Sequence, residues 1–152
     1  SIHLTGGFAM SAVSETSKAA LMQQLDTNLA TCFLCCRAAV NIMAEGPGRI
    51  VNVAARPALE WRAGAGMAAY AAAKAGVAAL TVALSEEVAK DGILVNAVAP
   101  SIINTPANRD AMPSADHSLW PTPEDVANTI LFLASPDNTV TRGAIVPVYG
   151  RT

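Results

Sequence analysis

Four short apolar runs alternate along this chain with three longer helical patterns. The runs lie at residues 2–8, 49–55, 93–98 and 144–148, and the first one leads into a pair of glycines. When strands alternate with helices, the strands form a parallel sheet and right-handed crossovers place the helices on its faces. The sequence therefore predicts an α/β fold, and residues 1–152 suit a single domain with a sizeable core.

The helical patterns carry start and stop signals. Apolar side chains recur at spacings of three and four over about residues 15–44, and an alanine-rich helix is expected over about residues 66–90. A third helix is predicted over residues 122–134, where Thr122 and Asp125 have the spacing of a capping box.

Gly- and Pro-containing segments separate these elements. Residues 56–66 and 108–121 are expected to be irregular loops. Either Ser14 or Ser17 would cap the first helix, and a turn at 45–48 would end it.

The composition limits the classes of partner. Hydrophobic residues make up 52% of the chain and charged residues only 14%, so we expect surfaces that a partner subunit covers. A net charge of −2 offers no electrostatic attraction for nucleic acid or for an anionic membrane surface. No apolar run is expected to span a bilayer and no signal peptide opens the chain, so we predict a cytoplasmic protein.

Three cysteines lie within the first predicted helix. Cys32, Cys35 and Cys36 are spaced at i, i+3 and i+4, and Cys35 and Cys36 are too close in sequence to be good disulfide partners. The sequence shows no second cluster that would complete a four-ligand metal site. We therefore expect reduced, buried thiols and no metal.

Tyr70 and Lys74 lie four residues apart in the alanine-rich helix, so both side chains emerge on one face. An ammonium beside a phenol favours phenolate and would lower the Tyr70 pKa from its reference value near ~10. Such a phenol exchanges a proton with a substrate near neutral pH. Taken alone, the pair is also consistent with a core aromatic residue beside a solvated lysine.

Asn28 interrupts the apolar face of the first helix. A buried amide needs hydrogen-bond partners, so Asn28 either bonds a neighbouring loop or holds a water molecule.

Together these segments resemble the C-terminal part of a short-chain dehydrogenase/reductase. The matching pieces occur in the family's order over essentially the whole chain: Thr5-Gly6-Gly7, Thr27-Asn28-Leu29, Arg49-Ile50-Val51-Asn52-Val53, Tyr70-x-x-x-Lys74-Ala75-Gly76, and Val95-Asn96-Ala97-Val98-Ala99-Pro100 followed by Thr105-Pro106. The resemblance implies a Rossmann-like parallel sheet with flanking helices and an NAD(P)-dependent oxidoreductase that transfers hydride.

The family implies a role for each matching residue. Tyr70 would be the general acid/base, and Lys74 would lower its pKa and bind the nicotinamide ribose. Asn28 would hold a water molecule in a proton relay. The glycine turn at Gly6 and Gly7 would approach the cofactor. Three further residues would lie against the nicotinamide: Pro100, Ile103 and Thr105.

Three departures from the family pattern bear on activity. Ala55 stands where the family has its catalytic serine, so a developing oxyanion loses a donor. Ser101 replaces the glycine that usually follows the proline. The first mononucleotide-binding half, with its glycine-rich turn and its ribose-reading residue, is missing from this chain, so the preference between NAD and NADP is not readable.

A narrower resemblance covers residues 105–120 together with Gly6-Gly7-Phe8 and Ala54-Ala55. These residues are similar to those of dihydropteridine reductases, which also lack the serine and reduce a quinonoid ring. The substrate would then be quinonoid or carbonyl, with Tyr70 protonating a ring nitrogen in the first case.

Other residues in the loops have two interpretations each. Trp61 and Trp120 would either stack on a flat substrate or pack the loops. His117 would contact the substrate or, as we expect, face solvent. Arg109 would either pair with an anionic group or anchor the lid. Asn52 is interpreted as structural.

Two hypotheses therefore remain: an oxidoreductase acting on a small molecule, or a non-catalytic family member that serves as a binding or assembly subunit. On either hypothesis we expect a homodimer or homotetramer, in which the Asn28 helix and the Tyr70 helix pair with their symmetry mates. The 152 residues alone are expected to be inactive.

Overall fold

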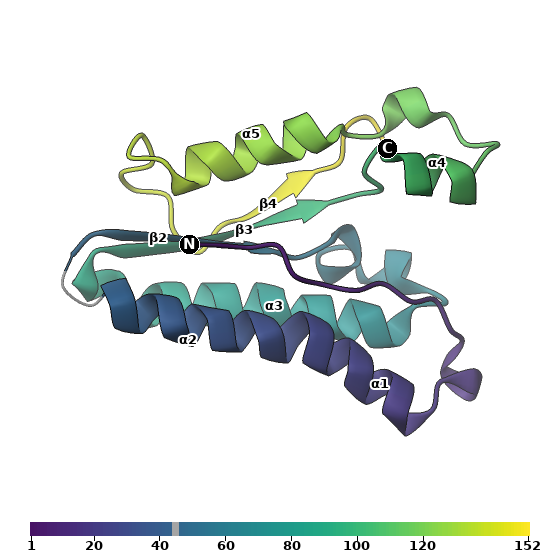
Figure 1. The fold of residues 1–152 in the computed structure, drawn as a ribbon, viewed down its shortest axis with the longest axis horizontal. Helices are drawn as coiled ribbons and strands as arrows, with labels where there is room; N and C mark the ends of the chain where they lie inside the picture. Colours follow the sequence, from purple (N-terminus) through teal and green to yellow (C-terminus); the bar gives the residue numbers. More distant parts are fainter. Residues whose placement is uncertain (44–45) are drawn as a thin grey trace.

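The computed structural model describes residues 1–43 and 46–152 and contains one parallel sheet in this part of the chain (Figure 1). Its strands lie in the order β1-β2-β3-β4. Their bounds are β1 (Ile2–His3), β2 (Gly48–Val53), β3 (Ile93–Pro100) and β4 (Ile145–Val148). The α/β architecture predicted from the alternation of strands and helices is confirmed.

Each face of the sheet has its own apolar core. Ile50 and Val51 are both fully buried although they are neighbours in β2, because successive strand residues point to opposite faces. Ile50 packs in a cluster that includes Val77 of α3. Val51 packs in a second cluster with Val126 of α5. Helices therefore cover both faces, as a parallel sheet requires.

The first face is covered by α2 (Thr31–Met43) and α3 (Ala68–Glu87), and α1 (Lys18–Gln24) packs against α3 (Figure 1). A π-helix (Leu25–Ala30) joins α1 to α2, so the single helix predicted from residue 15 starts later and changes its winding midway. Ser17 is the N-cap, since its hydroxyl accepts a hydrogen bond from the Ala20 amide at 3.1 Å. The predicted end at Ala44 lies outside the described residues.

α3 crosses closely over the π-helix. A Cβ atom on Gly76 would lie 2.7 Å from Leu29 Cδ2, so a larger residue there would require the Leu29 side chain to shift. A 3-10 turn (Ala89–Asp91) follows α3, and Gly92 then takes a left-handed conformation with φ 73°. α3 thus ends at Glu87, earlier than the predicted end at 91–92, and Gly92 ends the 3-10 turn that follows it.

α3 is also the one helix in the described residues that is long and apolar enough to cross a membrane by length and composition alone. The expectation that no apolar run reaches this length is therefore wrong, because alanine keeps the helix apolar over its 20 residues. Its inner face nevertheless buries polar side chains, Lys74, Thr81 and Ser85, against the rest of the chain.

The second face is covered by α5 (Pro123–Ala134), which begins with the predicted capping box. The Thr122 hydroxyl accepts from the Asp125 amide at 3.1 Å, and the Asp125 carboxylate accepts from the Thr122 amide at 2.8 Å.

The segments predicted as irregular loops contain short helices. α4 (Pro106–Ala111) and a 3-10 turn (His117–Leu119) lie between β3 and α5, and two 3-10 turns (Arg56–Ala58 and Trp61–Gly64) lie between β2 and α3. Proline at the first turn of α4 favours helix locally, which the loop interpretation of this segment overlooked.

Candidate active site

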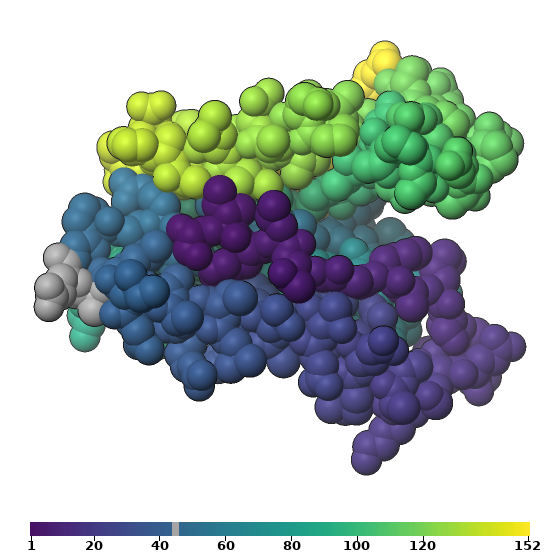
Figure 2. Space-filling view, in the orientation of Figure 1, coloured from purple at the N-terminus to yellow at the C-terminus, as the bar shows by residue number. Residues whose placement is uncertain are grey.

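The carboxyl ends of the parallel strands meet at one edge of the sheet. The surface is hollowed there, between the segment that follows β1 and the segment 106–120 (Figure 2). Ligands of open α/β sheets bind at this edge.

Tyr70 and Lys74 lie on the first turns of α3 at this edge. Lys74 is only 5% exposed, and its Nζ donates a hydrogen bond to the carbonyl oxygen of Val53 at 2.8 Å. The same Nζ lies 6.0 Å from the centre of the Tyr70 ring. Phe8 packs edge-to-face on that ring with their centres 5.0 Å apart. The pair predicted from spacing is therefore held on one face by one contact from β2 and one from the segment that follows β1.

Burial controls the acidity of both groups. It raises the pKa of Tyr70 and lowers the pKa of Lys74, where the charge of Cys32 opposes the effect. The prediction that Lys74 lowers the Tyr70 pKa is therefore wrong for the chain described here. The reason is that the ammonium is directed at the Val53 carbonyl rather than at the phenol, so desolvation dominates.

Asn28 bonds the loop that follows β1, which is one of the two alternatives the sequence left open. Its Oδ1 accepts from the Gly7 amide at 3.1 Å and its Nδ2 donates to the Gly7 carbonyl at 2.9 Å. The amide group also donates to the Gln24 carbonyl at 3.0 Å. With only 1% of Asn28 exposed, these bonds are needed to satisfy it.

Gly6 is the point at which Asn28 and Lys74 come together. A Cβ atom at this position would lie 2.9 Å from Asn28 Oδ1 and 3.2 Å from Lys74 Nζ. Only glycine fits between them without displacing one of the two. The structure thus brings together four residues predicted for the site: Gly6, Gly7, Asn28 and Lys74.

The π-helix that carries Asn28 could not be predicted from the sequence. Segments of this kind are rare and occur often at functional sites. The one signal was Asn28 itself, a polar residue on an otherwise apolar face.

The residues that follow β3 lie at the same edge but do not join the Gly6 cluster. Pro100 is buried as the last residue of β3. The side chain of Ile103 packs into the apolar core on the α5 face, and the Thr105 hydroxyl caps α4 by accepting from the Asn108 amide at 3.3 Å. Their predicted contacts with a nicotinamide remain a prediction.

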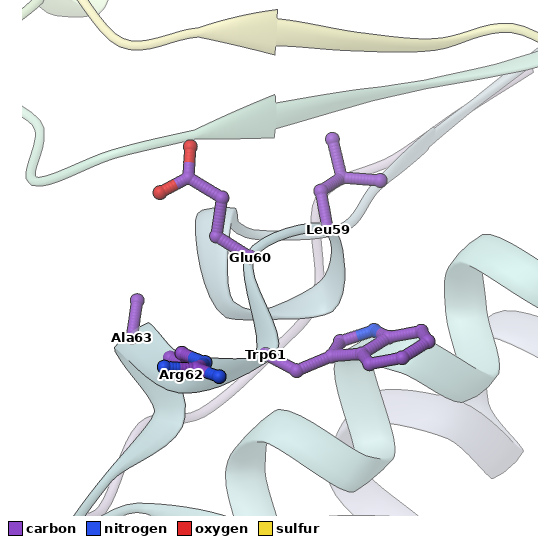
Figure 3. Close-up of a pocket in the computed structure, with 5 residues that line it drawn as sticks. All are labelled: Leu59, Glu60, Trp61, Arg62 and Ala63. Carbon is purple, nitrogen blue, oxygen red and sulfur yellow. The ribbon is translucent and has the colours of Figure 1, made fainter.

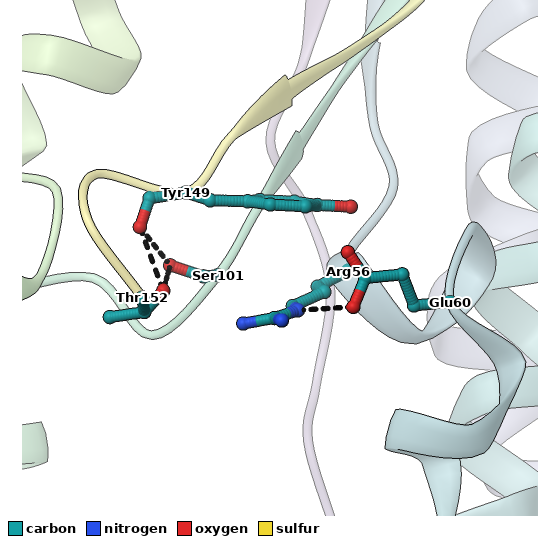
Figure 4. Close-up of polar contacts among 5 residues, drawn as sticks. All are labelled: Arg56, Glu60, Ser101, Tyr149 and Thr152. Atoms are coloured by element: carbon teal, nitrogen blue, oxygen red, sulfur yellow. Dashed lines mark hydrogen bonds and ion pairs between the residues drawn. The ribbon is translucent and has the colours of Figure 1, made fainter.

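Ala55 is buried directly after β2, at the position expected for a catalytic serine. It is the N-cap residue of the turn Arg56–Ala58 and presents only a methyl group. Ser101, which replaces the expected glycine, donates to the Tyr149 carbonyl at 3.0 Å and accepts from the Thr152 hydroxyl at 3.1 Å (Figure 4). Ser101 therefore ties the end of β3 to the C-terminal segment.

Charged and aromatic side chains lie beside Ala55. The Arg56 guanidinium pairs with the Glu60 carboxylate at 2.7 Å and lies 5.0 Å from the centre of the Tyr149 ring (Figure 4). Trp61 is 79% exposed and, with Glu60 and neighbouring residues, lines a shallow surface pocket (Figure 3). Trp61 is therefore free to contact a ligand.

The other loop residues hold the 106–120 segment together. Trp120 is buried against His117, with ring centres 4.6 Å apart, so it packs the loop. His117 is half-buried and bonds the Met112 carbonyl at 2.8 Å, so the expectation that it faces solvent is wrong. Arg109 donates to Asn104 Oδ1 at 2.7 Å and anchors the segment.

Asn52 is fully buried in β2, and its Nδ2 donates to the Thr81 hydroxyl at 3.0 Å. This contact between the sheet and α3 agrees with the structural role expected for Asn52.

The fold and this edge define a parallel α/β protein of the nucleotide-binding type. A family model described as enoyl-(acyl carrier protein) reductase matches residues 2–150. The chain belongs to the short-chain dehydrogenase/reductase family, and the Rossmann-like fold is confirmed.

Relatives of known activity and solved structures agree on the family. The chain is 43% identical over 136 residues to (2S)-[(R)-hydroxy(phenyl)methyl]succinyl-CoA dehydrogenase subunit BbsD of Thauera aromatica, covering 83% of this chain and 53% of that protein. It is 35% identical over 135 residues to the 3-oxoacyl-[acyl-carrier-protein] reductase FabG of Vibrio cholerae, covering 83% and 54%. A structure of ElxO with NADP bound has a TM-score of 0.87 at 27% identity, covering 98% of this chain and 64% of that one. The chain thus spans about half the length of the curated relatives it matches.

Proposed function

We propose that this chain carries the proton-transfer and nicotinamide side of an NAD(P)-dependent oxidoreductase, with Tyr70 as general acid/base. The observation that carries the proposal is the placement of Lys74. Its ammonium donates to the Val53 carbonyl at 2.8 Å and lies close to the Gly6 turn, one helical turn from Tyr70.

The residues at this edge fit a nicotinamide nucleotide. Solved relatives are complexes with NADP and with NADH, and in this chain the exposed Gly6 has no side chain to block the approach of such a nucleotide. Lys74 would bind the ribose hydroxyls, while Pro100, Ile103 and Thr105 would lie against the nicotinamide. When bound, the nicotinamide supplies or accepts the hydride.

The chain's own groups would move the proton. The Tyr70 phenol is protonated at neutral pH and burial raises its pKa further, so its proton is available for an oxygen or nitrogen that gains electrons. Asn28 fixes the turn beside Lys74 and would hold the water molecule of a proton relay.

Two substrate classes are compatible with the site. The names of BbsD and FabG describe a hydroxy acyl-CoA dehydrogenase and a 3-oxoacyl reductase, which supports a carbonyl or secondary alcohol substrate. Ala55 favours the other class, a quinonoid ring, because its reduction develops no alkoxide for a serine to stabilise. The resemblance of residues 105–120 to dihydropteridine reductases supports this second class.

A screen of both classes with the full-length protein, following NADH and NADPH absorbance, tests the function. Lys74→Met is expected to abolish turnover and to weaken cofactor binding. Lys90→Met is the matched control, since Lys90 is exposed beyond the end of α3 and should leave both unchanged. Turnover of Lys74→Met at the wild-type rate would contradict the proposal.

Ala55 also favours a second candidate function, a family member that binds partners without catalysis. That function predicts no affinity for NADH or NADPH in the full-length protein. Titration of the protein's intrinsic fluorescence with either nucleotide distinguishes the two candidates, because the oxidoreductase must show saturable binding.

A further inference from the structure

A second cluster of reactive side chains lies behind the candidate active site. Asn28, Cys32 and Cys36 are spaced at i, i+4 and i+8, and all three side chains are buried where this helical segment meets the rest of the chain. Cys32 is 6% exposed and Cys36 is 2% exposed. The fold brings His3, the last residue of β1, beside both thiols.

The spacing of the three donor atoms fits a metal ion. His3 Nδ1 lies 3.6 Å from Cys36 Sγ, and the donor atoms of His3, Cys32 and Cys36 all lie within 4.8 Å of one another. Ligands held at roughly 2.0–2.3 Å around tetrahedral zinc are separated by about 3.5–3.8 Å. The His3–Cys36 pair already has this separation, and Cys32 needs to approach by about 1 Å at most.

Neighbouring groups orient the histidine for this role. His3 Nε2 bonds the Ser1 hydroxyl at 2.8 Å. In the metal-free protein Nδ1 carries the proton that it donates to Asn52 Oδ1 at 2.8 Å. A metal ion at Nδ1 must displace this proton, and the Ser1 hydroxyl can then accept from Nε2–H.

Asn52 adds an oxygen to the cluster. Its Oδ1 lies 2.8 Å from His3 Nδ1 and 3.4 Å from Cys36 Sγ. Thr81 holds the other end of the amide, so the oxygen must face the cluster. The oxygen could accept a hydrogen bond from water in a fourth coordination position.

We propose that His3, Cys32 and Cys36 form a binding site for a thiophilic divalent metal ion of the Zn²⁺ class. Two thiolates and one imidazole are a donor set that such ions prefer over oxygen ligands. The sequence-based expectation of no metal considered the three cysteines alone, because nothing in the spacing reveals that His3 lies beside them.

Titration of the full-length, reduced protein with Co²⁺ tests the proposal, because cobalt reports its ligands in the visible and near-ultraviolet spectrum. We expect one equivalent to bind, with thiolate-to-cobalt charge-transfer bands and with the visible bands of a tetrahedral site. Zn²⁺ should displace the cobalt and bleach both sets of bands. Spectra without thiolate bands would overturn the proposal.

Variants assign the ligands. Cys32→Ser and Cys36→Ser should each weaken the charge-transfer bands and lower the Co²⁺ affinity at least tenfold, whereas Cys35→Ser should leave both unchanged. Cys35 is the matched control, since it lies on the same helix outside the cluster. Because the buried serine variants could unfold, His3→Gln on the half-buried β1 residue is measured beside them, with circular dichroism to verify folding. Wild-type binding in folded His3→Gln and Cys36→Ser would overturn the assignment.

Discussion

The Asn28 side-chain amide bonds both backbone polar groups of Gly7. Its Oδ1 accepts from the Gly7 amide nitrogen at 3.1 Å, and its Nδ2 donates to the Gly7 carbonyl oxygen at 2.9 Å. This two-point contact joins the π-helix to the turn after β1. It fixes the position of Gly6, and hence the space that Lys74 occupies.

Asn28→Ala should therefore destabilise the protein. The change leaves the Gly7 groups without their partner, and each unsatisfied buried group costs about 1–3 kcal/mol. We expect the free energy of unfolding from urea titration to fall by about 2 kcal/mol or more. Asn41→Ala, an exposed position on α2, is the control and should change it little. Equal stabilities of the two variants would contradict the account of Asn28.

Gly6→Ala should impair turnover more than stability. Its Cβ would lie 2.9 Å from Asn28 Oδ1 and 3.2 Å from Lys74 Nζ, so the flexible lysine is expected to shift. Displacement of a positioning group by 1 Å can cost on the order of 100-fold in rate. Turnover in the full-length protein measures the effect, and Gly46→Ala is the control because a Cβ there meets nothing within 4 Å.

Ala55→Ser distinguishes the substrate classes. A serine at this position would supply a hydroxyl donor for an oxyanion, and one such donor is worth roughly 100-fold in kcat. We expect a comparable gain with a carbonyl substrate and little change with a quinonoid one. Unchanged activity on both classes would show that this position does not face the reacting atoms.

The ionisation of Tyr70 should occur above pH 10. Burial raises its pKa from the ordinary value of 10.0, so the phenol of the unfolded chain ionises first as the pH rises. The contribution of Tyr70 to stability is thus complete below pH 10 and is lost as the pH rises through the folded-state pKa. Alkaline difference absorbance between wild type and Tyr70→Phe isolates this step. A midpoint below pH 10 in the free protein would contradict the dominance of burial.

The expected homo-oligomer has a candidate surface. Phe33 and Leu34 of α2 are 51% and 50% exposed, and with Leu25 and Leu29 they line an apolar groove. Phe33→Asp should reduce the mass found by sedimentation to that of a smaller species. Val140→Asp, at an exposed loop position, should leave it unchanged. A monomeric wild-type protein at micromolar concentration would contradict the prediction.

Local patterns in the sequence predicted the elements and their order. The capping box of Thr122 and Asp125, the glycine stop after α3 and the shared face of Tyr70 and Lys74 all depend on neighbours within a few residues. Such features are decided by backbone geometry and short-range hydrogen bonds.

The features that the sequence did not reveal depend on contacts between distant segments. The π-helix carries Asn28, and the Asn28 side chain bonds Gly7, which lies 21 residues earlier in the chain. The direction of the Tyr70 pKa follows from burial that only the folded chain defines. His3 meets Cys36 across 33 residues, so no spacing rule could pair them.

The central claim is that Tyr70 transfers the proton, and hydride transfer by Tyr70→Phe in the full-length protein tests it most directly. The substitution removes only the hydroxyl and keeps the ring that Phe8 contacts. Tyr149→Phe is the matched control at the chain's other tyrosine. We predict that Tyr70→Phe loses at least 100-fold in kcat with cofactor binding retained, while Tyr149→Phe stays active. Unchanged turnover in Tyr70→Phe would contradict the assignment.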